Sequence, residues 1–273
     1  MDTPRTRRRT DGSPSARTLL LTVLGEYVRH AGEARVWSRA VVDALAACGT
    51  GEAATRRALA RLVAEGWLGT ERAGRWTVLV LEPRLVALLT AWTRRLERAT
   101  GETPWQGAWQ QLVLHGPAQG RALVEEQLAF EGFGRLGPGV WIAADAGGVA
   151  ALDALLREQG VAAHATWLVS RADDDGELVG RAWDLAAVRA AHEAFVGRFA
   201  GVRAGTDEEA FVLRTRLVHA WRGTFARDPR LPAALLPPGW PGLVSTKLFI
   251  DTWRALRGPA DRHWRRLARD PRG

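Results

Sequence analysis

Cysteine, tyrosine and lysine are almost missing from this chain of 273 residues. Cys48 is the only cysteine, which excludes an internal disulfide and a metal cluster built on cysteine ligands. A single thiol is typical of proteins that work in a reducing compartment. The apolar runs are too short to span a bilayer, and the basic N-terminal stretch lacks the long apolar segment of a signal peptide. The sequence therefore predicts a cytoplasmic protein without a membrane segment.

Signatures of catalysis are missing as well. None of the six histidines stands in HExxH or another metal-ligand spacing, and there is no GxSxG elbow. The segment GPAQG at 116–120 lacks the GKS or GKT ending of a phosphate-binding loop. We expect Asp145 to lie in a turn, and the aspartates at 173–175 to lie in a solvated surface loop at 171–180. The sequence predicts no catalytic residue, no metal and no cofactor, and hence no enzyme.

Positive charge is in excess, and arginine carries almost all of it. Lysine and arginine number 38 against 30 acidic residues, a formal net charge of +8, and Lys247 is the only lysine. Such an excess indicates a polyanionic partner, either nucleic acid or an acidic membrane surface. Arginine binds phosphates and guanine edges better than lysine does. A GC-rich coding sequence would also enrich arginine, so the positions of the arginines have to decide.

The first third of the chain has the pattern of a winged helix-turn-helix domain at 15–82. Apolar residues recur at helical spacing in three stretches, with Ser15 as the expected N-cap of the first and Gly66 as the end of the third. Alternating residues then surround Ala73-Gly74, which is typical of a β-hairpin. The helices are expected at 15–30, 36–49 and 51–66, and the hairpin at 67–82. Residues 1–14 are expected to form a disordered basic arm that either reaches a DNA minor groove or stays solvated.

The rest of the chain predicts two further domains and an α+β class overall. Residues 83–104 are expected to form a linker helix. From 105 to 180, strand-like and helix-like segments alternate as in a ferredoxin-like domain, with one strand segment broken by a Gly-Pro-Gly turn. From 181 to 273 the pattern is mostly α-helical, and we expect this segment to be a third domain.

The helix expected at 51–66 holds the candidate DNA-contacting residues. Its apolar face, expected in the core, comprises Thr55, Leu59, Leu62 and Val63. Arg57 and Arg61 point the other way and Arg56 lies on the flank, with small alanines between them and no glutamate on the outward face to pair with them. Arg72 and Arg75 flank the hairpin tip. This arrangement favours DNA binding through the major groove; the alternative is a winged helix that binds another protein.

A set of segments between 15 and 260 matches the pattern of one known family. They read TLLLTVLGEYVRH, VWSRAVVDAL, ATRRALARLVAEGWL, WQQLVLHGP, FGRLGPGVWIA, RTRLVHAWR and DPRLPAALLPPGWPG. In these segments the chain resembles the PaaX-type family, the repressors of phenylacetic acid catabolism. The resemblance implies a transcriptional regulator with an N-terminal winged helix, a helical C-terminal domain, and a middle domain similar to the small CRISPR-associated endonuclease of spacer acquisition. The hairpin here departs from the family, because it is short and lacks the usual second aromatic-rich strand segment.

The resemblance of the middle domain raises the alternative of a nucleic-acid-processing nuclease. The related endonucleases hold a metal with an aspartate at the end of the first strand. Here the corresponding strand runs from Leu112 to Gly116 without a carboxylate. We therefore expect this domain to be structural, as a dimerisation or signal-relay element.

The resemblance also implies the partners. These are a double-stranded DNA operator read by a homodimer, and phenylacetyl-CoA or another aryl-CoA thioester as the effector that relieves repression; no membrane partner is expected. A CoA thioester joins anionic phosphates to an apolar group, so it needs guanidiniums and an apolar pocket. The candidate ligand-binding residues in the C-terminal segment are Arg214, Arg216, Trp221 and Arg222. The alternative is that these arginines form interdomain ion pairs and that the tryptophans are part of the core.

Overall fold

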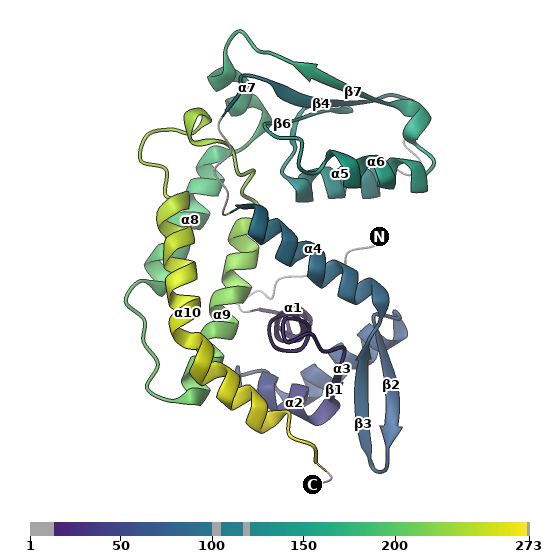
Figure 1. Ribbon diagram of the computed structural model, residues 1–273, viewed down its shortest axis with the longest axis vertical. Coiled ribbons are helices and arrows are strands. Elements are labelled where there is room, and N and C mark those ends of the chain that lie inside the picture. The colour runs from purple at the N-terminus through teal and green to yellow at the C-terminus, as the bar shows by residue number, and fades with distance from the viewer. Residues whose placement is uncertain (1–13, 100–104, 117–120, 272–273) are drawn as a thin grey trace. The chain divides into compact units, whose positions relative to one another are not determined.

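The computed structural model describes residues 14–99, 105–116 and 121–271 (Figure 1). Within these residues helices combine with two antiparallel sheets, which confirms the α+β class. The chain forms two compact units, and neither is continuous in sequence. The first unit contains residues of 97–196 and 223–245, and the second contains residues up to 96, residues 197–222 and the residues from 246 on. The segment 181–273, expected to be one domain, is therefore shared between both units. The predicted basic arm lies outside the described residues, apart from Pro14.

The second unit contains the three helices expected at its N-terminal end. The first helix begins at Ser15, whose hydroxyl accepts a hydrogen bond of 3.2 Å from the backbone N–H of Thr18, and this confirms the predicted N-cap. The third helix ends before Gly66, where a φ of +67° is a conformation that favours glycine. The helices are α1 (Ala16–Val23), which continues as the π-helix η1 (Leu24–Arg29), then α2 (Ser38–Ala47) and α3 (Glu52–Ala64).

A three-stranded sheet completes this part of the second unit. Its strands are β1 (Arg35–Trp37), β2 (Leu68–Ala73) and β3 (Trp76–Leu81), in the order β1-β3-β2. The hairpin of β2 and β3 was predicted, and its last pair is Ala73 opposite Trp76. Strand β1 was not predicted: Val36 was expected at the start of a helix, whereas it pairs with Leu79 of β3. A three-residue strand is stabilised by a partner far along the chain, so local periodicity does not reveal it.

One hydrophobic core holds the second unit together. The three N-terminal helices contribute Leu20, Val23, Leu24, Val41, Leu45 and Leu62, all fully buried or nearly so. Three further helices add residues to the same core, namely α4 (Pro83–Ala99), most of α9 (Asp207–Phe225) and the larger part of α10 (Gly242–Leu267). Their contributions are Leu85 and Leu89, Phe211, and Leu256 and Trp264. Burial of side chains of this size stabilises by roughly 1.5–3 kcal/mol each, so α9 and α10 are integral to the unit.

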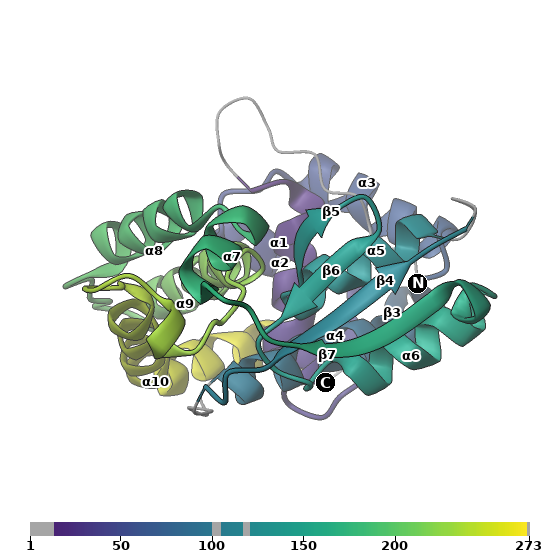
Figure 2. The same cartoon turned by 90° about the horizontal axis from the view of Figure 1, so that it is seen from above.

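The first unit is built on a four-stranded antiparallel sheet. Its elements follow the order β4 (Trp109–Leu114), α5 (Arg121–Glu131), β5 (Gly134–Gly137), β6 (Val140–Ala143), α6 (Val149–Glu158) and β7 (Ala165–Ser170). The strand order is β5-β6-β4-β7, and every neighbouring pair is antiparallel (Figure 2). The core between the sheet and helices α5 and α6 includes Leu112, Leu114, Val124, Leu128, Leu152 and Leu156.

The acidic run after β7 differs from the expectation of a solvated loop. It leads into helix α7 (Asp175–Ala182), whose N-cap is Asp174, with a carboxylate that accepts from the N–H of Glu177 at 3.0 Å. The carboxylate of Asp175 accepts from the indole N–H groups of Trp105 at 3.3 Å and Trp109 at 2.8 Å. These carboxylates are structural, because a helix start, the fully buried indole of Trp109 and the half-buried indole of Trp105 each need an acceptor. Asp145 does lie in a turn, where it accepts from the N–H of Gly147 at 2.7 Å.

Most of helix α8 (Leu185–Phe199), together with residues 223–245, completes the first unit. They are joined around His192, which is fully buried. Its Nδ1 lies 2.7 Å from Oγ of Ser245 and its Nε2 lies 3.0 Å from a carboxylate oxygen of Asp228. This network explains why the first turn of α10 belongs to the first unit although the rest of the helix does not.

Candidate nucleic-acid interface

Helix α3 is fixed by the side that it buries. Thr55 and Leu62 are fully buried and Leu59 is 6% exposed, so three of the four residues predicted for the core face are in the core; Val63 packs against that core while half-buried. The Thr55 hydroxyl also donates to the carbonyl of Gly51 at 3.3 Å, which ties the first turn of the helix. Because one face is held in this way, the opposite face must point to solvent.

The outward face of α3 carries unpaired positive charge. Arg57 and Arg61 are exposed and form no ion pair with any residue that the structure describes. Ala60, between them on the helix, is exposed as well. Arg56 differs, because it pairs with Glu52 at 2.7 Å across one helical turn. The expectation that no glutamate pairs with these arginines is therefore wrong for Arg56 and holds for the other two.

The carboxylate of Glu65 stands one helical turn after Arg61, where it could form an ion pair with that arginine. Glu65 instead accepts two hydrogen bonds from Arg17, at 2.8 and 2.5 Å. These bonds, with a smaller contribution from the charge of Arg61, hold the pKa of Glu65 below its ordinary value. Glu65 is thus neutralised mainly by a cation from α1, and the charge of Arg61 is left for an external partner.

The hairpin that follows α3 adds two more cations. A two-residue turn, Gly74-Arg75, joins β2 to β3, and the φ of +62° at Gly74 is the conformation for which type II′ turns use glycine. Arg72 and Arg75 are both exposed, and the guanidinium of Arg75 lies over the ring of Trp76 at 5.0 Å. The acidic residue of the hairpin, Glu71, is paired with Arg35. The tip of the hairpin is therefore cationic.

Arg214, one of the predicted ligand-binding residues, belongs to the core of the second unit. It is 1% exposed, and its guanidinium forms ion pairs with Glu26 of η1 at 2.6 Å and with Asp261 of α10 at 2.5 Å. Burial alone would lower the pKa of Arg214, but these carboxylates raise it above its ordinary value. The indole N–H of Trp253 also donates to Glu26, at 2.6 Å. Arg214 is therefore bound by carboxylates of the protein itself. This agrees with the alternative that the candidate arginines form ion pairs within the protein.

Trp221 and Arg222 are occupied in a similar way. Trp221 is 3% exposed and stacks on Phe249, with ring centroids 4.8 Å apart. Arg222 donates to the carbonyl of Leu21 at 3.4 Å and covers Gly25, where a Cβ atom would lie 2.6 Å from the guanidinium. Burial lowers the pKa of Arg222. Both side chains therefore attach α9 to the rest of the second unit.

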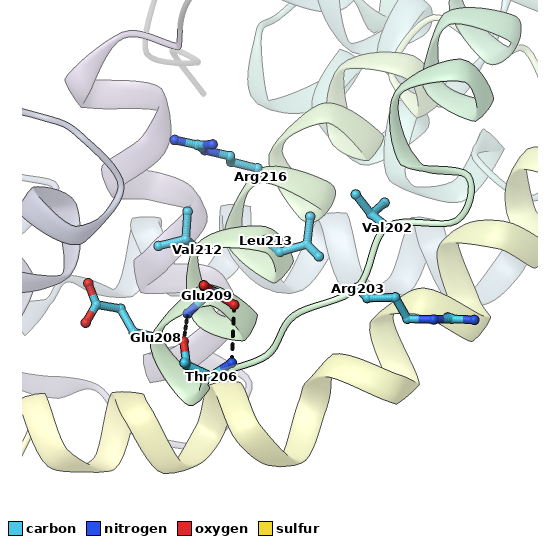
Figure 3. Close-up of a pocket in the computed structure, with 8 residues that line it drawn as sticks. All are labelled: Val202, Arg203, Thr206, Glu208, Glu209, Val212, Leu213 and Arg216. Carbon is cyan, nitrogen blue, oxygen red and sulfur yellow. Dashed lines mark hydrogen bonds between the residues drawn. The ribbon is translucent and has the colours of Figure 1, made fainter.

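Arg216 alone among the predicted ligand-binding residues is exposed, and it lines a pocket of about 500 Å³ in the second unit (Figure 3). The pocket lies between the loop before α9 and the first turns of that helix, and it is lined by Val202, Arg203, Thr206, Glu208, Glu209, Val212, Leu213 and Arg216. Glu209 accepts from the N–H of Gly205 at 2.7 Å and caps the helix together with Thr206. The rest of the lining is apolar at Val202, Val212 and Leu213 and charged at Arg203, Arg216 and Glu208.

The described residues offer little support for a metal site or a membrane segment. They contain no group of three or more histidine, cysteine, aspartate and glutamate side chains that could hold a metal ion. Strand β4 is followed by His115, whose Nε2 lies 3.3 Å from the Thr166 hydroxyl. No helix among the described residues is long and apolar enough to cross a membrane.

Three helices followed by a hairpin, with unpaired arginines on the third helix and at the hairpin tip, are typical of the DNA-binding part of a transcriptional regulator. The chain matches the family described as PaaX-like protein over residues 15–81, and the PaaX-like protein C-terminal domain over residues 183–266. It is 30% identical over 258 residues to the transcriptional repressor PaaX of Escherichia coli (strain K12), which covers 89% of this chain and 80% of that protein. The uncharacterized protein Rv0674 from Mycobacterium tuberculosis has a similar structure, with a TM-score of 0.61 and 28% identity, over 91% of this chain and 98% of that chain. The chain belongs to the PaaX family, whose members are transcriptional repressors and not enzymes.

Proposed function

We propose that this protein represses transcription by binding an operator in double-stranded DNA through α3. The observation that carries the proposal is that Arg57 and Arg61 are exposed opposite the buried face of the helix and form no ion pair with a described residue. In the major groove, arginines at this spacing reach guanine edges or phosphates. Arg56 forms an ion pair with Glu52 and is expected to contribute less to DNA binding. Arg72 and Arg75 of the hairpin would contact the neighbouring DNA backbone, where phosphates set the register of the protein.

The order of the elements supports the same proposal. We assign α1, α2, α3 and the hairpin to a winged helix-turn-helix, in which the third helix is the recognition helix. We assign β4, α5, β5, β6, α6 and β7 to a ferredoxin-like domain, because its β-α-β-β-α-β order fits the strand order β5-β6-β4-β7. In this assignment the sheet serves assembly or signal relay, and the protein is a cytoplasmic homodimer that reads two half-sites.

The family resemblance suggests which genes are regulated and which effector acts, and both are part of the proposal. The protein is proposed to repress genes of phenylacetate-type aromatic acid catabolism, and an aryl-CoA thioester is proposed to relieve the repression. Among the candidate ligand-binding residues, Arg216 is available for the phosphates, and Val212 and Leu213 beside it offer an apolar surface. Arg214 and Arg222 would instead hold α9 against η1 and α1, and Trp221 would hold it against α10. A ligand that shifts α9 would then act on operator binding through those contacts.

Binding to duplex DNA tests the DNA-binding part of the proposal. The affinity for an operator fragment is expected to fall steeply between 50 and 200 mM salt, by about 0.9 log units per phosphate contact for each log unit of salt. A winged helix that binds another protein would show no such affinity for the duplex at any salt concentration. That result would refute the proposed function.

Titration of a preformed operator complex tests the effector. Phenylacetyl-CoA is expected to release the DNA, whereas phenylacetate, which lacks the phosphates, is expected to do little. A hundredfold loss of operator affinity corresponds to about 2.7 kcal/mol of coupling. Arg216→Ala should weaken the response to the thioester without changing operator affinity in its absence. If no thioester binds, the effector is wrong and the DNA-binding proposal stands.

A further inference from the structure

Helix α3 carries a carboxylate on the part of its surface that lies outside the core. Glu52, the first residue of the helix, is exposed and forms an ion pair with Arg56, one turn further on. Glu65, the carboxylate that follows the last turn, is bound instead by Arg17 of α1. Phosphates repel an acidic side chain, so a carboxylate on a helix that binds DNA does not serve affinity for the DNA backbone.

The ion pair between Glu52 and Arg56 uses only one side of each partner. Nε of Arg56 donates to Oε1 of Glu52 at 2.7 Å, and Nη2 of Arg56 lies 2.7 Å from the same oxygen. Nη1 of the guanidinium and Oε2 of the carboxylate have no partner among the residues that the structure describes. The side chain of Arg56 is 64% exposed and that of Glu52 is 61% exposed. The pair therefore presents N–H donors and a carboxylate acceptor next to each other on the surface of the helix.

Donors next to an acceptor match the major-groove edge of a G·C base pair. In that groove guanine offers N7 and O6 as acceptors, and cytosine offers its N4 amino group as a donor. Arginine binds guanine through N7 and O6, and glutamate accepts from cytosine N4. An A·T pair presents an acceptor, a donor and an acceptor instead, which sets like groups against the ion pair. The chemistry of the two side chains together thus selects one kind of base pair.

The surroundings of Glu52 leave its side of the helix open. The residue before it is Gly51, and a Cβ atom added at Gly51 or at Gly49 would meet no other atom within 4 Å. In helix-turn-helix proteins the N-terminal residues of the recognition helix contact base edges. A helix about 10–12 Å across also fills a major groove about 12 Å wide, so its flanks come close to the DNA as well as its outward face. The flank that carries Glu52 and Arg56 is therefore within reach of base pairs when α3 lies in the groove.

We propose that Glu52 and Arg56 together read a G·C base pair of the operator, with Arg56 on the guanine and Glu52 on the cytosine. The inference rests on the proposed function, in which α3 is the recognition helix, and it makes Glu52 a specificity-determining residue. The ion pair carries no net charge, so it adds little to the affinity for phosphates. Its contribution is discrimination, because a wrong base pair leaves donors and acceptors of the interface without partners.

Affinity for a set of substituted operators tests the proposal. The operator is first selected from genomic fragments on the parent protein, and each of its base pairs is then replaced in turn. The parent is expected to lose at least about fivefold in affinity at one G·C position, the lower limit for a specific base contact. In Glu52→Ala and in Arg56→Ala this loss should fall below about twofold, while discrimination at the other positions is kept. Asp251→Ala is the matched control, because it breaks the same kind of ion pair one turn apart, with Lys247 on α10, and should leave all affinities unchanged.

Duplex DNA without the operator provides a second readout. Removal of the carboxylate frees the charge of Arg56 for phosphates, so Glu52→Ala should bind such DNA more tightly than the parent, with a salt dependence steeper by about one contact. If both α3 variants discriminate at every base pair as the parent does, the two residues read no base and the inference is wrong, while the proposed function stands. A loss of affinity in Glu52→Ala that is equal for all duplexes, together with a lower melting temperature, would show that Glu52 only stabilises the helix, and the inference would be wrong again. A parent that binds no duplex DNA refutes the proposed function and this inference with it.

Discussion

Replacement of Arg214 by methionine should destabilise the protein more than replacement of any exposed arginine on the same helix. The side chain is 1% exposed and pairs with Glu26 and Asp261 at 2.6 and 2.5 Å. The two partners differ, because the Glu26 side chain is 11% exposed whereas that of Asp261 is 37% exposed. Loss of the guanidinium therefore leaves Glu26 as a nearly buried carboxylate that keeps the hydrogen bond from the indole N–H of Trp253, while water can solvate Asp261.

The magnitude follows from this asymmetry. Breaking a buried ion pair by removing one partner costs about 3–5 kcal/mol, because the other charge stays buried without compensation. The pair with the half-exposed Asp261 adds at most about 1 kcal/mol. A loss of about 3–5 kcal/mol is a large part of the usual 5–15 kcal/mol of stability, and it should lower the melting temperature by roughly 6–20 °C. Methionine keeps most of the aliphatic packing, so the effect reports the charge.

Chemical denaturation with a double-mutant cycle provides the assay. Arg216→Met, two residues along α9 but exposed and outside any described ion pair, is the matched control and should stay within about 0.5 kcal/mol of the parent. The double variant Arg214→Met with Glu26→Gln should recover part of the loss, because no buried charge remains unpaired. If Arg214→Met costs no more than Arg216→Met, the guanidinium does not hold α9 against η1 and the reasoning fails.

Three further predictions concern titration, reactivity and cleavage. Hydrogen bonds from Arg262 and Arg266 hold the pKa of Asp207 at about 2 against an ordinary 3.8. Because this pKa is depressed in the folded state, Asp207→Asn should be less stable than the parent above about pH 4, and the difference should vanish as the pH falls to about 2 in acid unfolding. The Cys48 thiol, with its raised pKa of about 11, should resist a thiol reagent at about pH 8 until denaturant is added; rapid labelling of the folded protein would contradict its burial. Added Mg²⁺ or Mn²⁺ should produce no cleavage of DNA or RNA, and metal-dependent cutting that disappears on mutation of the first unit would show the opposite.

The parts that could be predicted from the sequence are those determined over short distances. The core face of α3, the cap at Ser15 and the hairpin at Gly74 all depend on residues within a turn or two of one another. Helix α7 was not predicted, although its signal is local. Asp174, followed three residues later by Glu177, has the spacing of a capped helix start. The ion pair between Arg56 and Glu52 could also have been predicted, because the two residues are four apart on a helix.

The parts that could not be predicted depend on contacts between distant residues. Glu65 is neutralised by Arg17, which is 48 residues away, and Arg61 is left without an ion pair among the described residues. The sequence makes Arg214 a candidate for binding phosphate, whereas in the structure its guanidinium binds Glu26, 188 residues away. The sharing of 181–273 between two units has the same origin, because α9 and α10 contribute to the core of the N-terminal helices.

Operator affinity of arginine variants tests the central claim most directly. The operator is first selected from genomic fragments on the immobilised protein, and fluorescence anisotropy then compares the parent with Arg57→Ala, Arg61→Ala and the control Arg254→Ala, an exposed arginine of α10. If α3 reads the major groove, each α3 variant should lose about 1–3 kcal/mol of binding, five- to over a hundredfold in affinity, while the control stays near the parent. Unchanged affinity in both α3 variants, with melting temperatures equal to the parent, would show that α3 does not bind the operator.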